Sequence, residues 1–510
     1  MMIESVSNRQ WREERRRWAQ FYADRLPDQL RAAVAIVETN PPEQLRPHFD
    51  TFISLLAAAD QNETSNEWLG LVDRLHPLPA RWGYWPSWLS ILHQATQKAM
   101  ALGQPARQAE YMAYAADLLL NSGRLARALD VAREATGLAR HSRAAWPLAV
   151  AGNVVAAALR SMARYDEAQA IVDETRGELT RMDPPQSAAR AVMAGALLDL
   201  EQMDLHRHFK RLDDALILGQ SLVERMAATE GIDPHDLATA YLRRATIVWV
   251  SAHYQAAADD LKHAATLYRA AGDHLQAVFA EANLGTVYYS LSRYAEAADF
   301  KLAAIRAAEE VNARHHLVSE LGDLGTIYIA LGRMDLAFDY TNRMVMLAAE
   351  LGNDAELSRG RGNRGYALMG LGRYQEALAD IEFSLNQYRE QDRLEGIIVT
   401  TVDLVLYLQG SGEVEQAIQL AEENYKTALR ADFPHLHLVA ARCLALFPPP
   451  VRQRALLEET LTLARKHGRP MDEAGCLFAL AGLSADAAER DALYREGARL
   501  LHQMGAAGWL

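Results

Sequence analysis

The chain has 510 residues, more than the roughly 100–200 residues of one ordinary domain. Half of the residues are hydrophobic and 23% are charged, which is typical of a folded protein rather than a disordered one. The formal net charge is −13. Wrapping nucleic acid or lying on anionic lipid both require a basic face, so we expect neither nucleic acid nor membrane as a partner.

The N-terminal residues become charged before any apolar core develops, so the sequence predicts no signal peptide. The longest apolar run, from Ala144 to Leu159, is shorter than the roughly 20 residues that span a bilayer. Two cysteines, Cys443 and Cys476, are too few for a disulfide framework or a four-cysteine zinc site. We therefore expect a cytoplasmic protein with reduced cysteines and no metal site.

The first hundred residues show helical periodicity but no repeat. Apolar spacing predicts helices at about 8–25, 28–39, 42–59 and 86–102. A tryptophan cluster, Trp82, Trp85 and Trp88 with Trp68 nearby, has two interpretations. It forms either an exposed docking patch or, as we favour, an apolar seal at the end of the helices that follow.

An internal repeat begins after this region. Ala128 and Ala168 occupy equivalent places in similar segments that are 40 residues apart. The next equivalent alanine, Ala215, comes 47 residues later, which predicts a longer loop or longer helices near residues 182–185. Beyond residue 431 the units shorten, with helical pairs expected near 435–467 and 471–504.

The repeat is regular between these two regions. Three segments align without gaps and place glycines at Gly285, Gly325 and Gly365 and alanines at Ala297, Ala337 and Ala377. Apolar residues recur at steps of three and four, so each unit reads as two amphipathic helices. Glycine in a helix interior costs roughly 1 kcal/mol against alanine and is tolerable where a neighbouring helix must come close. Neither helix buries its apolar stripe alone, so the units must stack.

The Leu-Gly, Gly-Arg-Tyr and Glu-Ala series resembles the tetratricopeptide repeat (TPR). The spacing of 40 is similar to the long-helix subclass of LGN/Pins-type scaffolds, kinesin light chains and bacterial TPR signalling regulators. The resemblance implies an all-α fold, a right-handed α-solenoid of roughly ten helical hairpins with a non-repeat helical cap. The expected regions are the cap at 1–105, divergent units at 106–231, the regular array at 232–432, and degenerate or capping helices at 433–510.

One glycine pattern imitates a nucleotide-binding motif. Gly360, Gly362 and Gly365 match G-x-G-x-x-G, but that motif requires a preceding strand, and the residues before it are helical. Gly365 is also the repeat glycine. No catalytic constellation is recognisable elsewhere, so we expect a non-catalytic protein without a cofactor.

One polar series lies at a fixed place in the repeat. Two residues before each repeat glycine, or in register with it, are Asn283, Asp323, Asn363 and Asp403. The resemblance implies that this helix face lines the inner, concave surface, where small neighbours such as Ala282, Gly322 and Gly362 would leave room for a peptide backbone. The candidate partner-binding residues are Asn283, Thr286, Tyr289, Asp323, Thr326, Arg359, Asn363, Tyr366 and Asp403.

Two interpretations of this series remain open. The side chains hold a peptide, or each bonds the adjacent helix and sets the pitch of the array. Charged residues add a second feature. An acidic step, the pair Glu320 and Asp323 in one repeat, precedes a basic step in the next repeat, formed by Arg359, Arg361 and Arg364. Such a gradient would fix the direction of a bound peptide.

The function predicted from the sequence is a scaffold that binds a peptide or a helix of a protein partner in the concave groove. The alternative is a regulatory or sensor subunit that changes superhelical pitch on binding a signal peptide and controls an effector. The sequence leaves the partner and the oligomeric state open.

Overall fold

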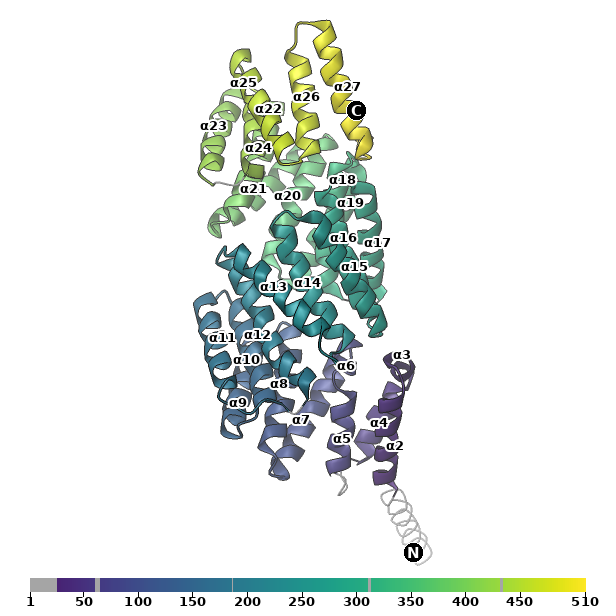
Figure 1. Cartoon of the computed structure of the whole chain (residues 1–510). Coiled ribbons are helices and arrows are strands. Elements are labelled where there is room, and N and C mark those ends of the chain that lie inside the picture. The colour runs from purple at the N-terminus through teal and green to yellow at the C-terminus, as the bar shows by residue number, and fades with distance from the viewer. Residues whose placement is uncertain (1–24, 60–64, 186, 311–312, 432–433) are drawn as a thin grey trace, which may run out of the picture. The chain divides into compact units, whose positions relative to one another are not determined.

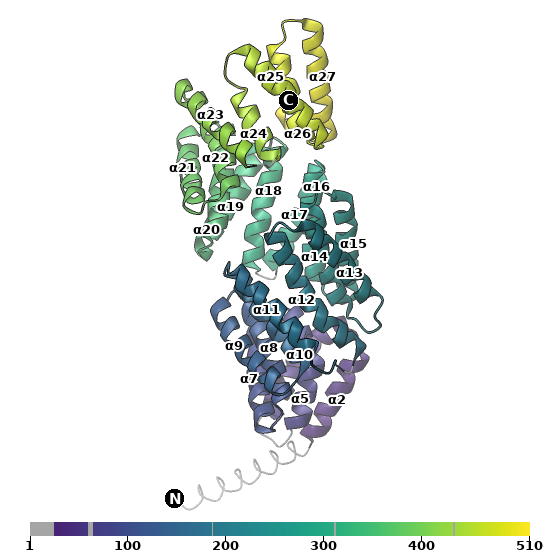
Figure 2. The same cartoon turned by 60° about the vertical axis from the view of Figure 1, so that its left-hand side comes forward.

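The computed structural model describes residues 25–59, 65–185, 187–310, 313–431 and 434–510, and these residues form helices and connecting turns without a strand. The helix expected at 8–25 lies almost wholly outside them. The chain forms two compact units, which divide between Ala277 and Val278. Figures 1 and 2 show the helices of each unit as antiparallel pairs.

The first unit begins with short helices and continues with longer pairs. Its helices are α2 (Leu26–Thr39), α3 (Pro42–Leu45), η1 (Arg46–His48), α4 (Phe49–Ala59), α5 (Ser65–Leu75), α6 (Leu78–Arg81), α7 (Trp85–Ala101), α8 (Pro105–Asn121), α9 (Leu125–His141), α10 (Ala145–Ser161), α11 (Tyr165–Leu179), α12 (Ala188–His208), α13 (Leu212–Ala227), α14 (Pro234–Val250) and α15 (Tyr254–Ala270). From α8 onward, consecutive helices pair as hairpins. Helix α12 has 21 residues and follows an irregular connection, which accounts for the spacing of 47.

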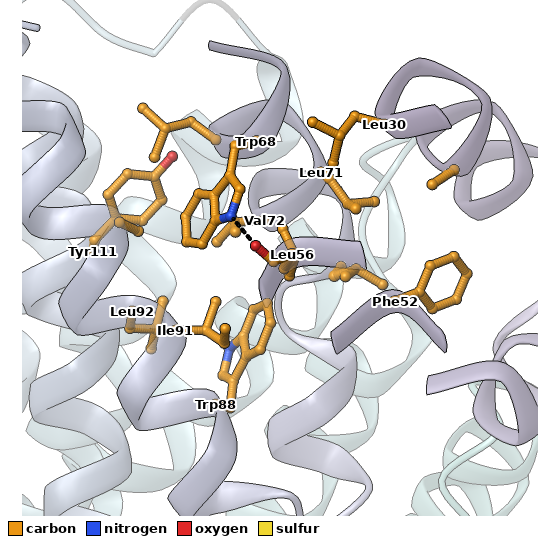
Figure 3. Close-up of a cluster of buried hydrophobic side chains, with 14 of the residues drawn as sticks. Leu30, Phe52, Leu56, Trp68, Leu71, Val72, Trp88, Ile91, Leu92 and Tyr111 are labelled. Atoms are coloured by element: carbon orange, nitrogen blue, oxygen red, sulfur yellow. Dashed lines mark hydrogen bonds between the residues drawn. The ribbon is translucent and has the colours of Figure 1, made fainter. Parts of the chain in front are cut away.

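The tryptophan cluster is mostly core. Trp68 and Trp88 are fully buried, and the indole N–H of Trp68 donates to the carbonyl of Leu56 at 2.9 Å (Figure 3). The same apolar cluster includes Tyr111 of α8, so the core of the cap continues into the first hairpin. Only Trp85 is substantially exposed, at 38%. The sealing interpretation is therefore confirmed for the two buried rings.

The second unit comprises most of α16 and all later helices. These are α16 (His274–Ser290), α17 (Tyr294–Glu310), α18 (Arg314–Ala330), α19 (Met334–Leu351), α20 (Asp354–Gly370), α21 (Tyr374–Glu390), α22 (Leu394–Gly410), α23 (Val414–Arg430), α24 (Pro434–Leu444), α25 (Pro450–Lys466), α26 (Pro470–Leu483), α27 (Ala487–Gln503) and η2 (Ala507–Trp509). The last four α-helices form the two pairs expected near 435–467 and 471–504. The units divide inside the regular array, and the four-region division by repeat spacing stays a prediction.

The repeat glycines let the two helices of a hairpin approach each other. A Cβ at Gly285 would lie 3.1 Å from the carbonyl oxygen of Ala297, and one at Gly365 would lie 2.8 Å from Cγ1 of Ile381. A Cβ at Gly325 would collide with the methyl group of Thr341. The sequence prediction of a close approach is confirmed at all three positions.

From α8–α9 to α22–α23, the turn inside each hairpin has a left-handed residue. Gly332, Gly372 and Gly412 have φ of +71°, +74° and +85°. This conformation closes a helix by pairing its last carbonyls, and glycine adopts it without a Cβ penalty. At the equivalent turns, Ala252 and Ser292 adopt φ of +61° and +59° and bear that penalty.

The C-terminal residues return to a repeat turn of the second unit. The indole N–H of Trp509 donates to the carbonyl of Ala330 at 2.9 Å. A Cβ at Gly508 would lie 2.5 Å from the carbonyl oxygen of Leu331, and one at Gly332 would lie 2.6 Å from the carbonyl carbon of Gly508. Two backbones thus meet where neither has a side chain.

Candidate functional site

The nine candidate residues all lie on the first helices of consecutive hairpins in the second unit. We call their common surface the first-helix face. Helix α16 carries Asn283, Thr286 and Tyr289, α18 carries Asp323 and Thr326, α20 carries Arg359, Asn363 and Tyr366, and α22 carries Asp403.

The part of this face on α16 remains available to a ligand. Asn283 is exposed, and its side chain has no hydrogen-bond partner in the part of the chain that the structure describes. Thr286 and Tyr289 are half-buried. Burial raises the pKa of Tyr289 above its ordinary value, and its ring lies 5.3 Å from that of Tyr294. The phenol is therefore a neutral group able to donate or accept one hydrogen bond.

Asp323 belongs to an ion-pair network between helices. Its carboxylate accepts from Nζ of Lys301 on α17 at 2.7 Å and from Nη1 of Arg359 on α20 at 3.0 Å. Lys301 also pairs with Glu320 at 2.9 Å. Burial alone would raise the pKa of Asp323, but the two cations outweigh it and hold that pKa below its ordinary value. The carboxylate is therefore ionised and connects three helices.

Thr326 and Asn363 bond to each other. Nδ2 of Asn363 donates to Oγ1 of Thr326 at 3.0 Å, and the hydroxyl of Thr326 donates to the carbonyl of Gly322 at 3.0 Å. Both side chains are half-buried. This is the arrangement that the helix-tying interpretation expects at these two positions, whereas Asn283 fits the ligand-binding interpretation.

Asp403 is the most enclosed residue of the series. Its side chain is almost fully buried, and no hydrogen bond to it is present among the described residues. Burial raises the pKa of Asp403 to about 8. Burial, with the nearby Asp403 charge as the next cause, also raises the pKa of half-buried Tyr366 to about 12. The carboxyl group is thus protonated over most of the neutral range.

The expectation that small neighbours leave room for a peptide is wrong. Ala282, Gly322 and Gly362 are all buried. A Cβ at Gly322 would lie 2.5 Å from Nη2 of Arg359, and one at Gly362 would lie 2.9 Å from Oγ of Ser384. Side chains of the neighbouring helices fill this space, so the small residues permit helix packing and not ligand entry.

The acidic and basic steps of the sequence are paired internally. Arg361 and Arg364 of α20 both contact Asp380 of α21, at 2.7 and 2.6 Å. Arg359 pairs with Asp323. Because these cations already have carboxylate partners, the expected gradient is largely neutralised before any ligand arrives.

Sequence reasoning missed Lys301, which connects the network at its buried end with a side chain only 2% exposed. A signal for it is visible in the repeat. At steps of 40, its position is occupied by Leu261, Thr341 and Ile381, all buried. A lysine at a core position of a repeat requires a buried counter-charge, which Glu320 supplies.

The glycine-rich motif lies inside a helix. Gly360, Gly362 and Gly365 are buried in the interior of α20, where their backbone groups belong to the helix and face no phosphate site. Across the described ranges, no group of three metal-ligating side chains is present, and no helix is both long and apolar enough to cross a bilayer.

No protein-family model and no curated protein matches this chain. Solved structures do. A Rap protein complexed with Competence and Sporulation Factor matches with a TM-score of 0.54 and 13% identity over 70% of this chain and 99% of its own. The apo form of RapI matches with a TM-score of 0.51 and 13% identity over 70% of this chain and 98% of its own.

These similarities concern the fold. Together with hairpins at a spacing of 40 and glycine-mediated packing, they show a TPR-type, all-α repeat protein. The fold predicted from the sequence is thus confirmed.

Proposed function

We propose that this chain is a non-catalytic, cytoplasmic binding protein that holds a peptide or a helix of a protein partner on the first-helix face of its second unit. The observation that carries the proposal is the row of polar side chains that α16, α18 and α20 present at one register of the repeat. Most of them are half-exposed, and Asn283 has a free amide. An amide at this place can bond a peptide backbone through both its donor and its acceptor.

The first-helix face has two parts, one whose side chains already bond to each other across helices and one, on α16, whose Asn283 amide is free. Asp323 with Arg359, and Thr326 with Asn363, are already bonded across helices. The lone pairs and N–H groups that these contacts do not use can still form hydrogen bonds with the backbone of a bound peptide. We therefore assign the principal contact to α16, with the paired residues as a preformed support.

A second candidate is a regulatory or sensor subunit that responds to a signal peptide. It is favoured by the bonds between first helices, since a ligand that competes for Asp323 or Asn363 would alter contacts that join α18 to α20. The similar Rap structure is described as complexed with Competence and Sporulation Factor, which is consistent with this candidate.

The test is selection of peptides from a random displayed library on the intact chain, followed by affinity measurement. Asn283→Ala should weaken the selected peptides about 2- to 10-fold, the loss of one hydrogen bond. Asn386→Ala is the matched control, because Asn386 is an exposed, unpartnered asparagine among the described residues, on the second helix α21. Selected peptides that bind both variants as tightly as the parent chain would exclude the first-helix face as their site.

A further inference from the structure

A cavity of about 350 Å³ lies inside the first unit. Helices α8, α10 and α12, the start of α14 and the turn between α5 and α6 line it. Its volume is within the range of small-ligand sites. None of its lining residues belongs to the first-helix face, so it is independent of the function proposed above.

One wall of the cavity is aromatic and fixed by hydrogen bonds. The indole N–H of Trp146 donates to the hydroxyl of Tyr114 at 2.9 Å, and that hydroxyl donates to Glu110 at 2.7 Å. The ring of His76 stacks on Tyr114 with 3.7 Å between centroids. Burial lowers the pKa of His76 to about 3, so this ring is neutral at pH 7. The wall is therefore rigid and carries no positive charge of its own.

The arginines at the cavity already have carboxylate partners. The two arginines that line it are Arg81, paired with Asp233 at 2.7 Å, and Arg190, paired with Glu110 at 3.2 Å, and the lining Asp73 pairs with Arg107 at 2.5 Å. A ligand anion would have to displace one of these carboxylates. Since Asp117 and Asp236 also line the cavity, carboxylates outnumber the arginines there.

Asp117 lines the cavity and has no cationic partner among the described residues. It accepts one hydrogen bond, at 3.2 Å, from the neutral amide of Asn121. Burial raises the pKa of Asp117 to about 6, so it is mostly ionised at pH 7 yet lacks a counter-charge. Asn153, a polar residue in the apolar middle of α10, also lines the cavity, and no described residue bonds its amide.

We propose that this cavity binds an organic cation, an alkylammonium or guanidinium group, with Asp117 as its counter-ion. Asn153 supplies a carbonyl acceptor for the N–H groups of the cation. The cation belongs either to a free amine or to a basic side chain of a peptide. Both sources share this chemistry, and the experiment separates them.

The experiment is calorimetric titration of the full chain at pH 7.5 with phenethylammonium and with phenethyl alcohol, a neutral probe of similar shape. The ammonium should bind at least about tenfold more tightly than the alcohol, since a charge-assisted bond is the difference between them. Asp117→Asn should remove that preference while leaving the alcohol unaffected. Asp130→Asn, an equal charge change at an exposed site on α9, should alter neither probe.

A second arm identifies the source of the cation. An end-blocked Gly-Gly-Arg-Gly-Gly peptide is compared with its glutamine counterpart. Binding of the arginine peptide that depends on Asp117 identifies a peptide side chain, and binding of the ammonium alone identifies a free amine. If Asp117→Asn does not fold, Asn153→Leu takes its place and should weaken the cation severalfold. No saturable cation binding up to about 1 mM, or equal binding by the variants, overturns the proposal.

Discussion

The contact between the C-terminal residues and the turn after α18 can be tested with one pair of glycine substitutions. Gly332 and Gly372 occupy the same place in consecutive repeats and have almost the same φ, +71° and +74°. They differ in their surroundings. A Cβ at Gly372 meets nothing within 4 Å, whereas one at Gly332 would lie 2.6 Å from the carbonyl carbon of Gly508 and 3.0 Å from the backbone nitrogen of Trp509.

Gly372→Ala should lower the free energy of unfolding by about 1–2 kcal/mol, the penalty of an alanine in the left-handed region. Gly332→Ala incurs the same penalty and also displaces η2, because backbone atoms cannot rotate away as a side chain can. The displacement breaks the hydrogen bond from Trp509 to Ala330, worth about 0.5–1.5 kcal/mol, together with the packing around it.

Two measurements test this prediction. Urea denaturation gives the free energy of unfolding of the second unit, and hydrogen exchange measured by mass spectrometry reports on the C-terminal amides. Gly332→Ala should be less stable than Gly372→Ala by about 1 kcal/mol or more. Only Gly332→Ala should also accelerate amide exchange at Trp509 and Leu510, whose N–H groups bond within the C-terminal turn. Equal destabilisation by the two variants with unchanged exchange at these amides would refute the reasoning.

Three further predictions concern individual residues. Burial raises the pKa of Asp403 to about 8, so the folded chain retains a proton that the unfolded chain loses near its ordinary value of 3.8. The free energy of unfolding should therefore fall as the pH rises from about 4 to about 8. Asp403→Asn should make the melting temperature depend less on pH over this range. Ala252→Gly should stabilise the first unit by about 0.5–1 kcal/mol in urea denaturation, because φ there is +61°; a loss of stability would contradict this. Asn363→Ala should cost about 0.5–1.5 kcal/mol through the lost bond to Thr326, whereas Asn283→Ala should change thermal stability by less than about 0.5 kcal/mol. Equal melting temperatures for these two variants would count against a helix-tying role of Asn363.

The repeat architecture could be predicted from the sequence because it depends on local spacing. Gly285, Gly325 and Gly365 recur at intervals of 40, and the structure places each against the second helix of its own hairpin. The partners are about 12 to 16 residues apart in the chain, so the pattern that encodes the contact lies within one repeat unit. The two late helical pairs can be predicted for the same reason, because the shortened units and the prolines that separate them are features of short segments.

The candidate site was predictable only in part. The position of Asn283, Asp323, Asn363 and Asp403 on equivalent first helices followed from the repeat. Their environments did not, since an exposed amide, an ion pair, an interhelical hydrogen bond and a buried acid all occur at this one register. Each environment depends on side chains contributed by neighbouring helices, and the period of the repeat does not specify those.

The sequence by itself determined the helical hairpins, their spacing and the small residues that let them pack, because 3.6-residue periodicity and steric fit are properties of short segments. Only the tertiary structure decided that Lys301 neutralises Asp323 and that Gly508 meets Gly332 across 176 positions. It likewise decided that Asp117 lines a cavity and has no cationic partner among the described residues. These contacts arise where distant segments meet, and charge and burial there depend on three-dimensional neighbours that no local pattern records.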